Sequence, residues 1–283
     1  MGDTVRVSRT VVAFNAHPDD EALLMAGTLA KAAAQGHRVV LVVATDGDLG
    51  LTSAAHRADG DLGRRRLAEF ETSARAIGAA RTQWLGYADS GMVGELAPDP
   101  AGRTRFLRAD PSVVADVVAQ ILREEAADVL IGYDRNGGYG HRDHVRVHEI
   151  ARLAAARADT PRLLEATVPR ETITRALSLV RRLPGVDVEV ALDQWQQAYL
   201  PRDEIAYAID VRRHIAAKRA AMAAHASQAA GDEGDRTLAA FLRIPRPLYD
   251  VVFGREWFAD ATGASADGAK PATDIFEGLT ALG

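Results

Sequence analysis

The sequence predicts an α/β protein, built on a Rossmann-like, mostly parallel sheet with helices on both faces and a C-terminal extension. Strand-like and helix-like segments alternate through the first half of the chain, which favours a parallel sheet with helical crossovers. Residues 38–45 (RVVLVVAT) are almost continuously apolar, as in a strand that is buried on both faces. In such sheets ligands bind at the carboxyl ends of the strands, so polar residues that follow strands are the first candidates for a site.

Each predicted strand is a short β-branched or apolar run, and the strands are expected at residues 10–16, 38–45, 82–85, 128–132, 162–168 and 205–209. The helix ends carry their own signals. Gly36 and Gly78 are suitable C-terminal caps, and Pro111 stands in a first turn, where its missing N–H costs least. The helices are expected at residues 21–35, 62–77, 111–125, 143–157, 171–182 and 211–230.

The C-terminal part of the chain is less regular. An aromatic stretch follows Pro245 and Pro247, and we expect it to pack in the core rather than to form a binding box; it contains Tyr249, Phe253, Trp257 and Phe258. Residues 261–271 are rich in Ala, Gly and Asp and predict a loose segment. Residues 275–282 are apolar enough to dock on the body. With no repeat and no clear linker, residues 1–260 are expected to form a single domain and residues 261–283 a tail.

The composition excludes several classes of function. The 34 Lys and Arg against 39 Asp and Glu give a net charge of −5, which argues against general nucleic-acid binding. The chain has no Cys, so any metal must be held by His, Asp or Glu. No signal-peptide pattern and no run of about 20 apolar residues is found, so we expect a cytoplasmic protein without a membrane span.

The first polar cluster is the segment Ala16-His17-Pro18-Asp19-Asp20-Glu21, which follows the first predicted strand. Four ionisable side chains in five residues are costly at a strand end unless something organises them. A divalent cation does so, because imidazole and carboxylate groups are its natural ligands. Capping of the next helix by one Asp is the alternative, but it leaves His17 and the second Asp unexplained.

The second polar cluster runs from Asp134 to His148 (DRNGGYGHRDHVRVH) and follows the predicted strand at residues 128–132. Its three glycines allow a sharp bend and a close approach to a ligand. His144 and His148 are four residues apart on one helix face, a spacing that can bind one metal ion. Because both clusters lie at the same edge of the sheet, we expect a shared metal site. A metal with an open position for water, a spare carboxylate and a spare imidazole predict metal-assisted hydrolysis of an amide or ester.

The AHPDDE segment together with the later HRDH resembles the LmbE-like or PIG-L family of zinc-dependent N-deacetylases, over roughly residues 8 to 260. Members of this family remove acetyl from N-acetylglucosaminyl groups. Within it, residues 133–144, 89–92, 106–111 and 224–228 are most similar to the mycothiol-biosynthesis branch, which acts on N-acetylglucosaminyl-inositol. The resemblance therefore implies a metal-dependent hydrolase for such a substrate, with a mycothiol conjugate amidase or a natural-product glucosaminyl deacetylase as alternatives.

The resemblance also implies a role for each site residue. It makes His17, Asp20 and His144 the ligands of one Zn²⁺, with Fe²⁺ or Co²⁺ as other possible metals, and it makes His148 a non-ligand. Asp19 becomes the general base. His141 faces the oxyanion or acts as an acid, Asp143 orients His141, Tyr139 stabilises the intermediate, and Arg66 and Asp89 grip the glucosamine hydroxyls.

The chain departs from the mycothiol-branch pattern at Arg142, which stands where that pattern has Pro. If its guanidinium faces the pocket, it favours an anionic aglycone. We further expect Glu21 behind the site, Asp46 and Asp48 either lining the pocket or solvated, and Lys218 and His225 at the rim or in packing. Three histidines are expected on the surface: His37, His56 and His214.

Two other classes of protein compete with a hydrolase. A sugar-binding or regulatory protein would need neither Asp19 nor His141, since metal binding alone requires neither. A nucleotide-binding dehydrogenase would need a glycine-rich turn after the first strand, where HPDDE stands instead and would repel a pyrophosphate. The expected partner is a small N-acetylglucosaminyl molecule, and a homo-oligomer is left open because apolar patches can be buried at an interface.

Overall fold

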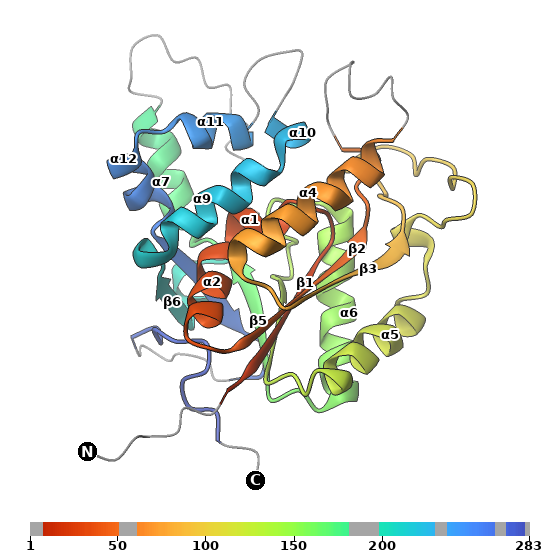
Figure 1. The fold of residues 1–283 in the computed structure, drawn as a ribbon, viewed down its shortest axis with the longest axis horizontal. Coiled ribbons are helices and arrows are strands. Elements are labelled where there is room, and N and C mark those ends of the chain that lie inside the picture. The colour runs from red at the N-terminus through yellow and green to blue at the C-terminus, as the bar shows by residue number, and fades with distance from the viewer. Residues whose placement is uncertain (1–7, 51–60, 181–197, 230–236, 264–269, 281–283) are drawn as a thin grey trace.

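The computed structural model describes residues 8–50, 61–180, 198–229, 237–263 and 270–280, which contain a seven-stranded sheet (Figure 1). The strand order is β3-β2-β1-β4-β5-β7-β6. The first five strands are parallel, whereas β7 pairs antiparallel with both β5 and β6. The sheet therefore confirms the predicted α/β class. The strands are β1 (Thr10–Asn15), β2 (Arg38–Thr45), β3 (Arg81–Tyr87), β4 (Val129–Tyr133), β5 (Arg162–Thr167), β6 (Tyr207–Asp210) and β7 (Arg255–Asp260).

Helices cover both faces of the sheet, because alternate side chains of each central strand point to opposite faces. In β1, Val11 and Ala13 join the core beneath α2, α4 and α9, whereas Val12 and Phe14 join the core beneath α5 and α6, as Figure 1 shows. The helices are α1 (Asp20–Leu24), α2 (Ala26–Ala34), α4 (Leu62–Ile77), α5 (Pro111–Glu124), α6 (Arg142–Ala158), α7 (Arg170–Val180), α9 (Ile215–Ala224), α10 (Ala226–Ala229), α11 (Thr237–Arg243) and α12 (Arg246–Phe253).

Two predicted helices are interrupted in the structure, so their prediction as continuous helices was wrong. The helix expected at residues 21–35 breaks at Met25 into α1 and α2. The helix expected at residues 211–230 breaks at His225 into α9 and α10, after a short 3-10 turn. Both breaks allow contacts with residues that are distant in the sequence. Local sequence periodicity carries no information about such contacts.

The C-terminal region adds three described elements that the sequence did not predict, α11, α12 and β7. β7 inserts between β5 and β6, and its register sets Phe258 opposite Tyr207. Tyr249 and Phe258 are fully buried in the core, so the aromatic stretch packs there as expected. Ile275 is also buried in this core. The predicted ranges 171–182, 211–230, 261–271 and 275–282 each extend beyond the described residues, and His56 lies outside them.

The strand order places the two polar clusters side by side. The chain proceeds outward from β1 to β3 on one side and from β4 to β5 on the other, so the order reverses between β1 and β4. A crevice forms outside the carboxyl ends of the strands at such a reversal. The first cluster follows β1 and the second follows β4. None of the described helices has the length and apolar character needed to cross a membrane.

Candidate metal centre

The loop after β4 is folded tightly by an aspartate and by its glycines. Asp134 is fully buried, and its Oδ1 accepts hydrogen bonds from the N–H groups of Asn136 and Gly138, both at 3.0 Å. Gly137 has a φ of 63°, and a Cβ there would lie 2.8 Å from the backbone N of Val145. Only glycine therefore fits this turn. The turn carries the carbonyl of Gly137 to the imidazole of His144.

His17, Asp20 and His144 form a triangle of donor atoms. His17 Nδ1 and His144 Nε2 lie 3.3 Å apart. Asp20 lies 3.3 Å from each of them, with Oδ2 facing His17 Nδ1 and Oδ1 facing His144 Nε2. Ligands about 2.05 Å from a tetrahedral zinc ion are about 3.3 Å apart. The two imidazole nitrogens are therefore spaced as two ligands of one tetrahedral metal ion, and a different oxygen of Asp20 lies at the same distance from each of them.

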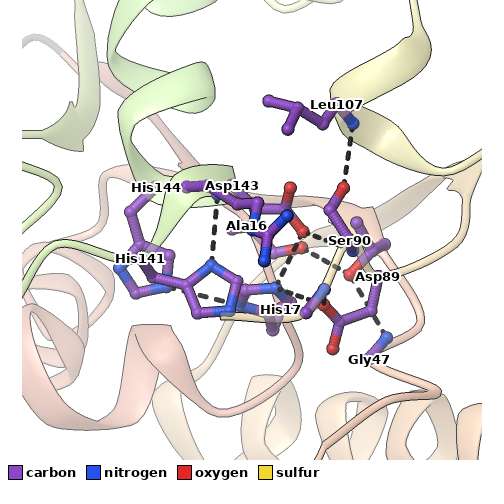
Figure 2. A network of polar contacts seen from close by, with 12 residues as sticks. Ala16, His17, Gly47, Asp89, Ser90, Leu107, His141, Asp143 and His144 are labelled. Carbon is purple, nitrogen blue, oxygen red and sulfur yellow. Dashed lines mark hydrogen bonds and ion pairs between the residues drawn. The ribbon is translucent and has the colours of Figure 1, made fainter. Parts of the chain in front are cut away.

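The outer nitrogens of both imidazoles already have partners. His144 Nδ1 lies 3.2 Å from the carbonyl oxygen of Gly137, an acceptor, so this nitrogen carries the proton. His17 Nε2 lies 3.3 Å from Asp143 Oδ2 and 3.4 Å from Asp89 Oδ1, which are also acceptors. The nitrogens that face the triangle are therefore left with lone pairs, the arrangement of metal-binding histidines whose second nitrogen is held by a carboxylate or carbonyl. Figure 2 shows His17 between the other histidines and these carboxylates.

The surrounding carboxylates give the site an excess of negative charge. Burial lowers the pKa of His17, yet Asp89, Asp143 and Asp20 together raise it well above 6.5. The pKa of Asp20 is lowered well below its ordinary value, because His144 and His17 outweigh the effect of burial. The cluster thus attracts a positive charge, and a divalent cation can replace the proton there.

The ligand set cannot be read from proximity alone. The ligand atoms of His17, His141 and His144 also lie within 4.8 Å of one another, as do those of His17, Asp89 and Asp143. His148 points away from this cluster: its Nδ1 lies 3.2 Å from Glu165 Oε1 and 3.2 Å from the Tyr133 carbonyl oxygen. The spacing argument for His148 as a ligand is therefore wrong.

Asp19 lies at the start of α1 in an unusual backbone conformation, with a φ of 115°. Burial raises its pKa to about 6, against the opposing effect of Arg66. Arg66 Nη2 lies 3.0 Å from Asp19 Oδ1 and donates to the Pro18 carbonyl at 2.5 Å, while its Nη1 donates to Gly47. A carboxylate with a pKa near neutrality is suited to proton transfer. The buried guanidinium of Arg66 holds that carboxylate from behind.

His141 caps the N-terminus of α6. Its Nδ1 accepts the Asp143 N–H at 3.1 Å, so the ring proton lies on Nε2. Burial, together with the neighbouring His17 and His144, lowers the pKa of His141 to about 3. The ring is therefore neutral at pH 7 and can donate a hydrogen bond from Nε2.

Asp143 and Asp89 contact His17 rather than the ring of His141. Ser90 N–H donates to Asp143 Oδ2 at 2.9 Å, and the same oxygen faces His17. The contact between Asp143 and His141 runs through the backbone N–H of Asp143. We expected Asp143 to orient the ring of His141, but its carboxylate faces His17 instead. The negative charge of Asp143 still raises the pKa of His141. Burial raises the pKa of Asp89, but His17 overcomes it and leaves that pKa well below its ordinary value.

Tyr139 and Arg142 lie at the rim of the site. Tyr139 is 41 % exposed, and its ring stands edge-on to that of His144, with centroids 5.1 Å apart. Arg142 donates to the carbonyl oxygens of Met92 and Gly94 at 3.3 and 3.2 Å. Its guanidinium therefore binds the loop that follows Asp89.

The sequence profile of the family described as "PIG-L: GlcNAc-PI de-N-acetylase" matches residues 12–155, which contain both loops. The chain belongs to the PIG-L family. Curated relatives named "1D-myo-inositol 2-acetamido-2-deoxy-alpha-D-glucopyranoside deacetylase" include one from Thermomonospora curvata, 32% identical and covering 100% of both chains. Another, from Nakamurella multipartita, is 36% identical and covers 96% of this chain and 97% of its own.

Solved structures share the PIG-L fold at lower identity. The N,N'-diacetylchitobiose deacetylase from Pyrococcus horikoshii has a TM-score of 0.57 and 22% identity, covering 89% of this chain and 84% of its own. The 4-carboxy-2-hydroxymuconate hydratase GalB from Pseudomonas putida has a TM-score of 0.54 and 15% identity, covering 89% of this chain and 96% of its own. Since a hydratase shares this fold, the fold alone does not choose the reaction.

Several residues around the PIG-L site escaped the sequence analysis. Tyr133 stacks on His144 with centroids 4.2 Å apart and an interplanar angle of 14°, and its hydroxyl accepts the Ala16 N–H. The position of Tyr133 at the end of β4 could have marked this residue as part of the site. Tyr199 accepts a hydrogen bond from the Asn136 side chain and donates its N–H to the Gly138 carbonyl. No local signal marks that contact, because it joins segments more than 60 residues apart.

Other predicted polar residues brace the loops. Asp46 pairs with Arg103, and Asp48 accepts from Arg105 Nη1 at 2.8 Å and from the Asp89 N–H at 2.9 Å. Neither aspartate is simply solvated. His37 accepts the Arg9 N–H at 3.0 Å, and burial lowers the pKa of His214. Lys218 and His225 are fully buried, so of the two alternatives expected for them, rim or packing, packing holds. Glu21 is also fully buried and accepts the Asp19 N–H, in the place behind the site that was expected for it.

Proposed function

We propose that this PIG-L family member is a metal-dependent N-deacetylase that hydrolyses the acetamide of N-acetylglucosaminyl-inositol. The single observation that carries the proposal is the meeting of two imidazole lone pairs and the Asp20 carboxylate at one buried point. Full-length relatives that are named as deacetylases of this compound supply the substrate. The proposal includes zinc as the metal, with iron(II) or cobalt(II) as alternatives, and a cytoplasmic location.

The metal would be held by His17, Asp20 and His144. When bound there, a zinc ion lowers the pKa of a water molecule and polarises an amide carbonyl. The second nitrogens of both imidazoles are fixed by Asp143, Asp89 and the Gly137 carbonyl. These contacts orient both rings so that His17 Nδ1 and His144 Nε2 already face Asp20 before any metal arrives.

Asp19 would act as the general base. It removes a proton from the attacking water as the oxygen adds to the amide carbon, and its pKa of about 6 lets it hold that proton. Asp19 then returns the proton to the amine nitrogen as the C–N bond breaks. The acid so formed gives its remaining proton to the amine, so the products are acetate and the ammonium form of the amine, and the atoms and charges balance.

His141 would stabilise the oxyanion. Its Nε2–H is the free donor of a neutral ring whose Nδ1 is occupied by the Asp143 N–H, and such a donor acts most strongly in a buried site. Tyr139 can add a second hydrogen bond from the rim. We assign Asp89 to the glucosamine hydroxyls, as the family resemblance implies. The contacts of Arg66 favour holding Asp19 over gripping the sugar.

Free-amine release by the zinc-loaded protein tests the proposal. The substrates are N-acetylglucosaminyl-inositol, N-acetylglucosamine and a mycothiol conjugate. Fast release from the inositol compound supports the proposal. Preferred cleavage of the conjugate would make the protein an amidase instead, and release from none of them would favour a binding protein. Slow release from all three would keep the chemistry but require a different glucosaminyl aglycone.

A further inference from the structure

A second buried polar network lies behind Asp19. Glu21 is fully buried, and its two carboxylate oxygens have separate partners. Oε2 accepts the N–H of Asp19 at 3.1 Å. Oε1 accepts the Ser73 hydroxyl at 2.5 Å and faces His225 Nε2 at 2.7 Å. One carboxylate thus joins the start of α1, the middle of α4 and the junction of α9 and α10.

The contact with Asp19 lies at a strained point of the backbone. With a φ of 115°, the backbone of Asp19 occupies a region that residues other than glycine rarely adopt. Such a conformation persists only where the surroundings hold it in place. Glu21 holds its N–H, and Arg66 holds its carboxylate and the Pro18 carbonyl. The side chain is therefore fixed from two directions.

Glu21 needs its own support to hold that position. A buried carboxylate is stable only when donors satisfy it, and Ser73 and His225 supply two donors to the oxygen that Asp19 does not use. His225 reaches Glu21 because the helix breaks at this residue, which has φ −85° and ψ 57°. The interruption between α9 and α10 thus delivers an imidazole from 204 residues away in the sequence.

We propose that Glu21, Ser73 and His225 form a positioning network that fixes the backbone of Asp19, and that His225 is therefore a positioning residue, which acts on catalysis through Glu21 and Asp19. The inference rests on the proposed role of Asp19 as the base. None of the three side chains is among the proposed metal ligands, so their loss should affect proton transfer and leave metal binding intact.

His225→Ala is the main test, and His225→Gln is its conservative partner. Displacing a base by a fraction of an ångström to an ångström lowers the rate by as much as about 10²-fold. We therefore expect His225→Ala to lower kcat by roughly 10- to 10²-fold with KM within about twofold and zinc content unchanged. His225→Gln keeps an N–H donor for Glu21 and should recover most of the loss.

A double-mutant cycle and a matched control sharpen the test. Ser73→Ala should lower kcat less than His225→Ala, and the double variant should be non-additive because both residues act through Glu21. His148→Ala removes another largely buried His–Glu contact, the one with Glu165, and should keep kcat. Unchanged kcat in His225→Ala, no recovery in His225→Gln, or an equal loss in His148→Ala would each overturn the inference.

A structural measurement separates this inference from the proposed function. Crystal structures of the zinc-loaded wild type and His225→Ala should show Asp19 leaving its left-handed conformation only in the variant, with the cobalt(II) absorption spectrum the same in both. If Asp19 moves in this way but the wild type releases no amine, the proposed function fails and the network stands. If the wild type is active and Asp19 stays in place in a fully active His225→Ala, the network is wrong.

Discussion

Two buried ionic clusters, one at the first turn of α2 and one at the start of α1, differ in how their charges are balanced. In the first, Lys218 Nζ lies 2.6 Å from Glu256 Oε1, and both side chains are nearly inaccessible to solvent. Glu256 also accepts the N–H groups of Gly27 and Thr28 at 2.9 and 2.7 Å. The carboxylate thus caps the first turn of α2, where the helix dipole favours negative charge. Each charge in this cluster has an opposite charge or a donor.

The second cluster, at the metal centre, is not balanced in this way. Four aspartates surround His17 and its neighbours, and among the described side chains Arg66 is the permanent cation that contacts a carboxylate of one of them. Asp143 Oδ1 is buried and has no hydrogen-bond partner among the residues that the structure describes. A closed ion pair stabilises a fold, whereas an open cluster with excess negative charge is suited to bind a cation. Burial of charge alone therefore does not mark a functional site. An excess of buried charge that the protein's own side chains leave unneutralised does.

The largest effect is expected from removing a metal ligand. His144→Ala should lose zinc and bring amine release to background, because the remaining donors no longer enclose the ion. Metal analysis of the purified protein, with chelated and zinc-restored wild type as the control, checks this expectation. Normal zinc content in the variant would remove His144 from the ligand set.

Breaking the closed cluster should affect stability rather than chemistry. Lys218→Met leaves Glu256 without its charge partner and should lower the free energy of unfolding by about 3–5 kcal/mol. Urea titration measures this loss. Replacing both partners, Lys218→Met with Glu256→Gln, should recover part of it. A large loss of kcat per folded molecule would show that the two clusters are not independent.

Asp19→Ala tests the division of labour between the neighbouring aspartates. It should keep zinc but lower kcat by about 10²-fold or more, the usual result of removing a general base. Asp20→Ala should instead lose the metal. Zinc content and kcat of the two variants, measured side by side, decide the matter: metal loss in Asp19→Ala would mean that the two roles are exchanged.

The His148–Glu165 pair offers a smaller, pH-dependent test of a closed contact. Burial lowers the pKa of His148, but Glu165 outweighs it and raises that pKa above 6.5. The folded protein therefore binds this proton more tightly than the unfolded chain, and the stabilisation is complete below about pH 6.5 and lost as the pH rises through the folded pKa. The unfolding free energies of wild type and His148→Gln should differ most at low pH, by less than about 1 kcal/mol. A difference that grows with pH would contradict the assignment.

The smallest effect is expected at Arg142. Its guanidinium contacts only backbone carbonyls among the described residues, and it is the first residue of α6, where Pro is well tolerated. Arg142→Pro should leave turnover of a neutral N-acetylglucosaminide within about threefold. A collapse of kcat would place the loop at residues 91–94, which Arg142 holds, among the parts needed for catalysis.

Sequence patterns predicted the parallel half of the molecule well. The apolar run of β2 and the capped helix α4 have the bounds expected for them, because strands buried on both faces and helices with glycine C-caps carry strong local signals. The two polar clusters were placed at one edge of the sheet for a similar reason. Parallel strands all end at the same edge, so residues that follow them must converge there.

What the sequence determined by itself is therefore the fold class, the two loops that meet, and the chemistry of the residues in them. The tertiary structure decided which nitrogen of each histidine faces the centre, where Asp143 points, and which distant residues support Asp19. The physical reason is that these contacts join side chains across tens to hundreds of positions, such as His225 with Glu21 and Glu256 with the start of α2. Such pairs interrupt helices whose local periodicity is intact, and only the folded chain brings them within hydrogen-bond distance.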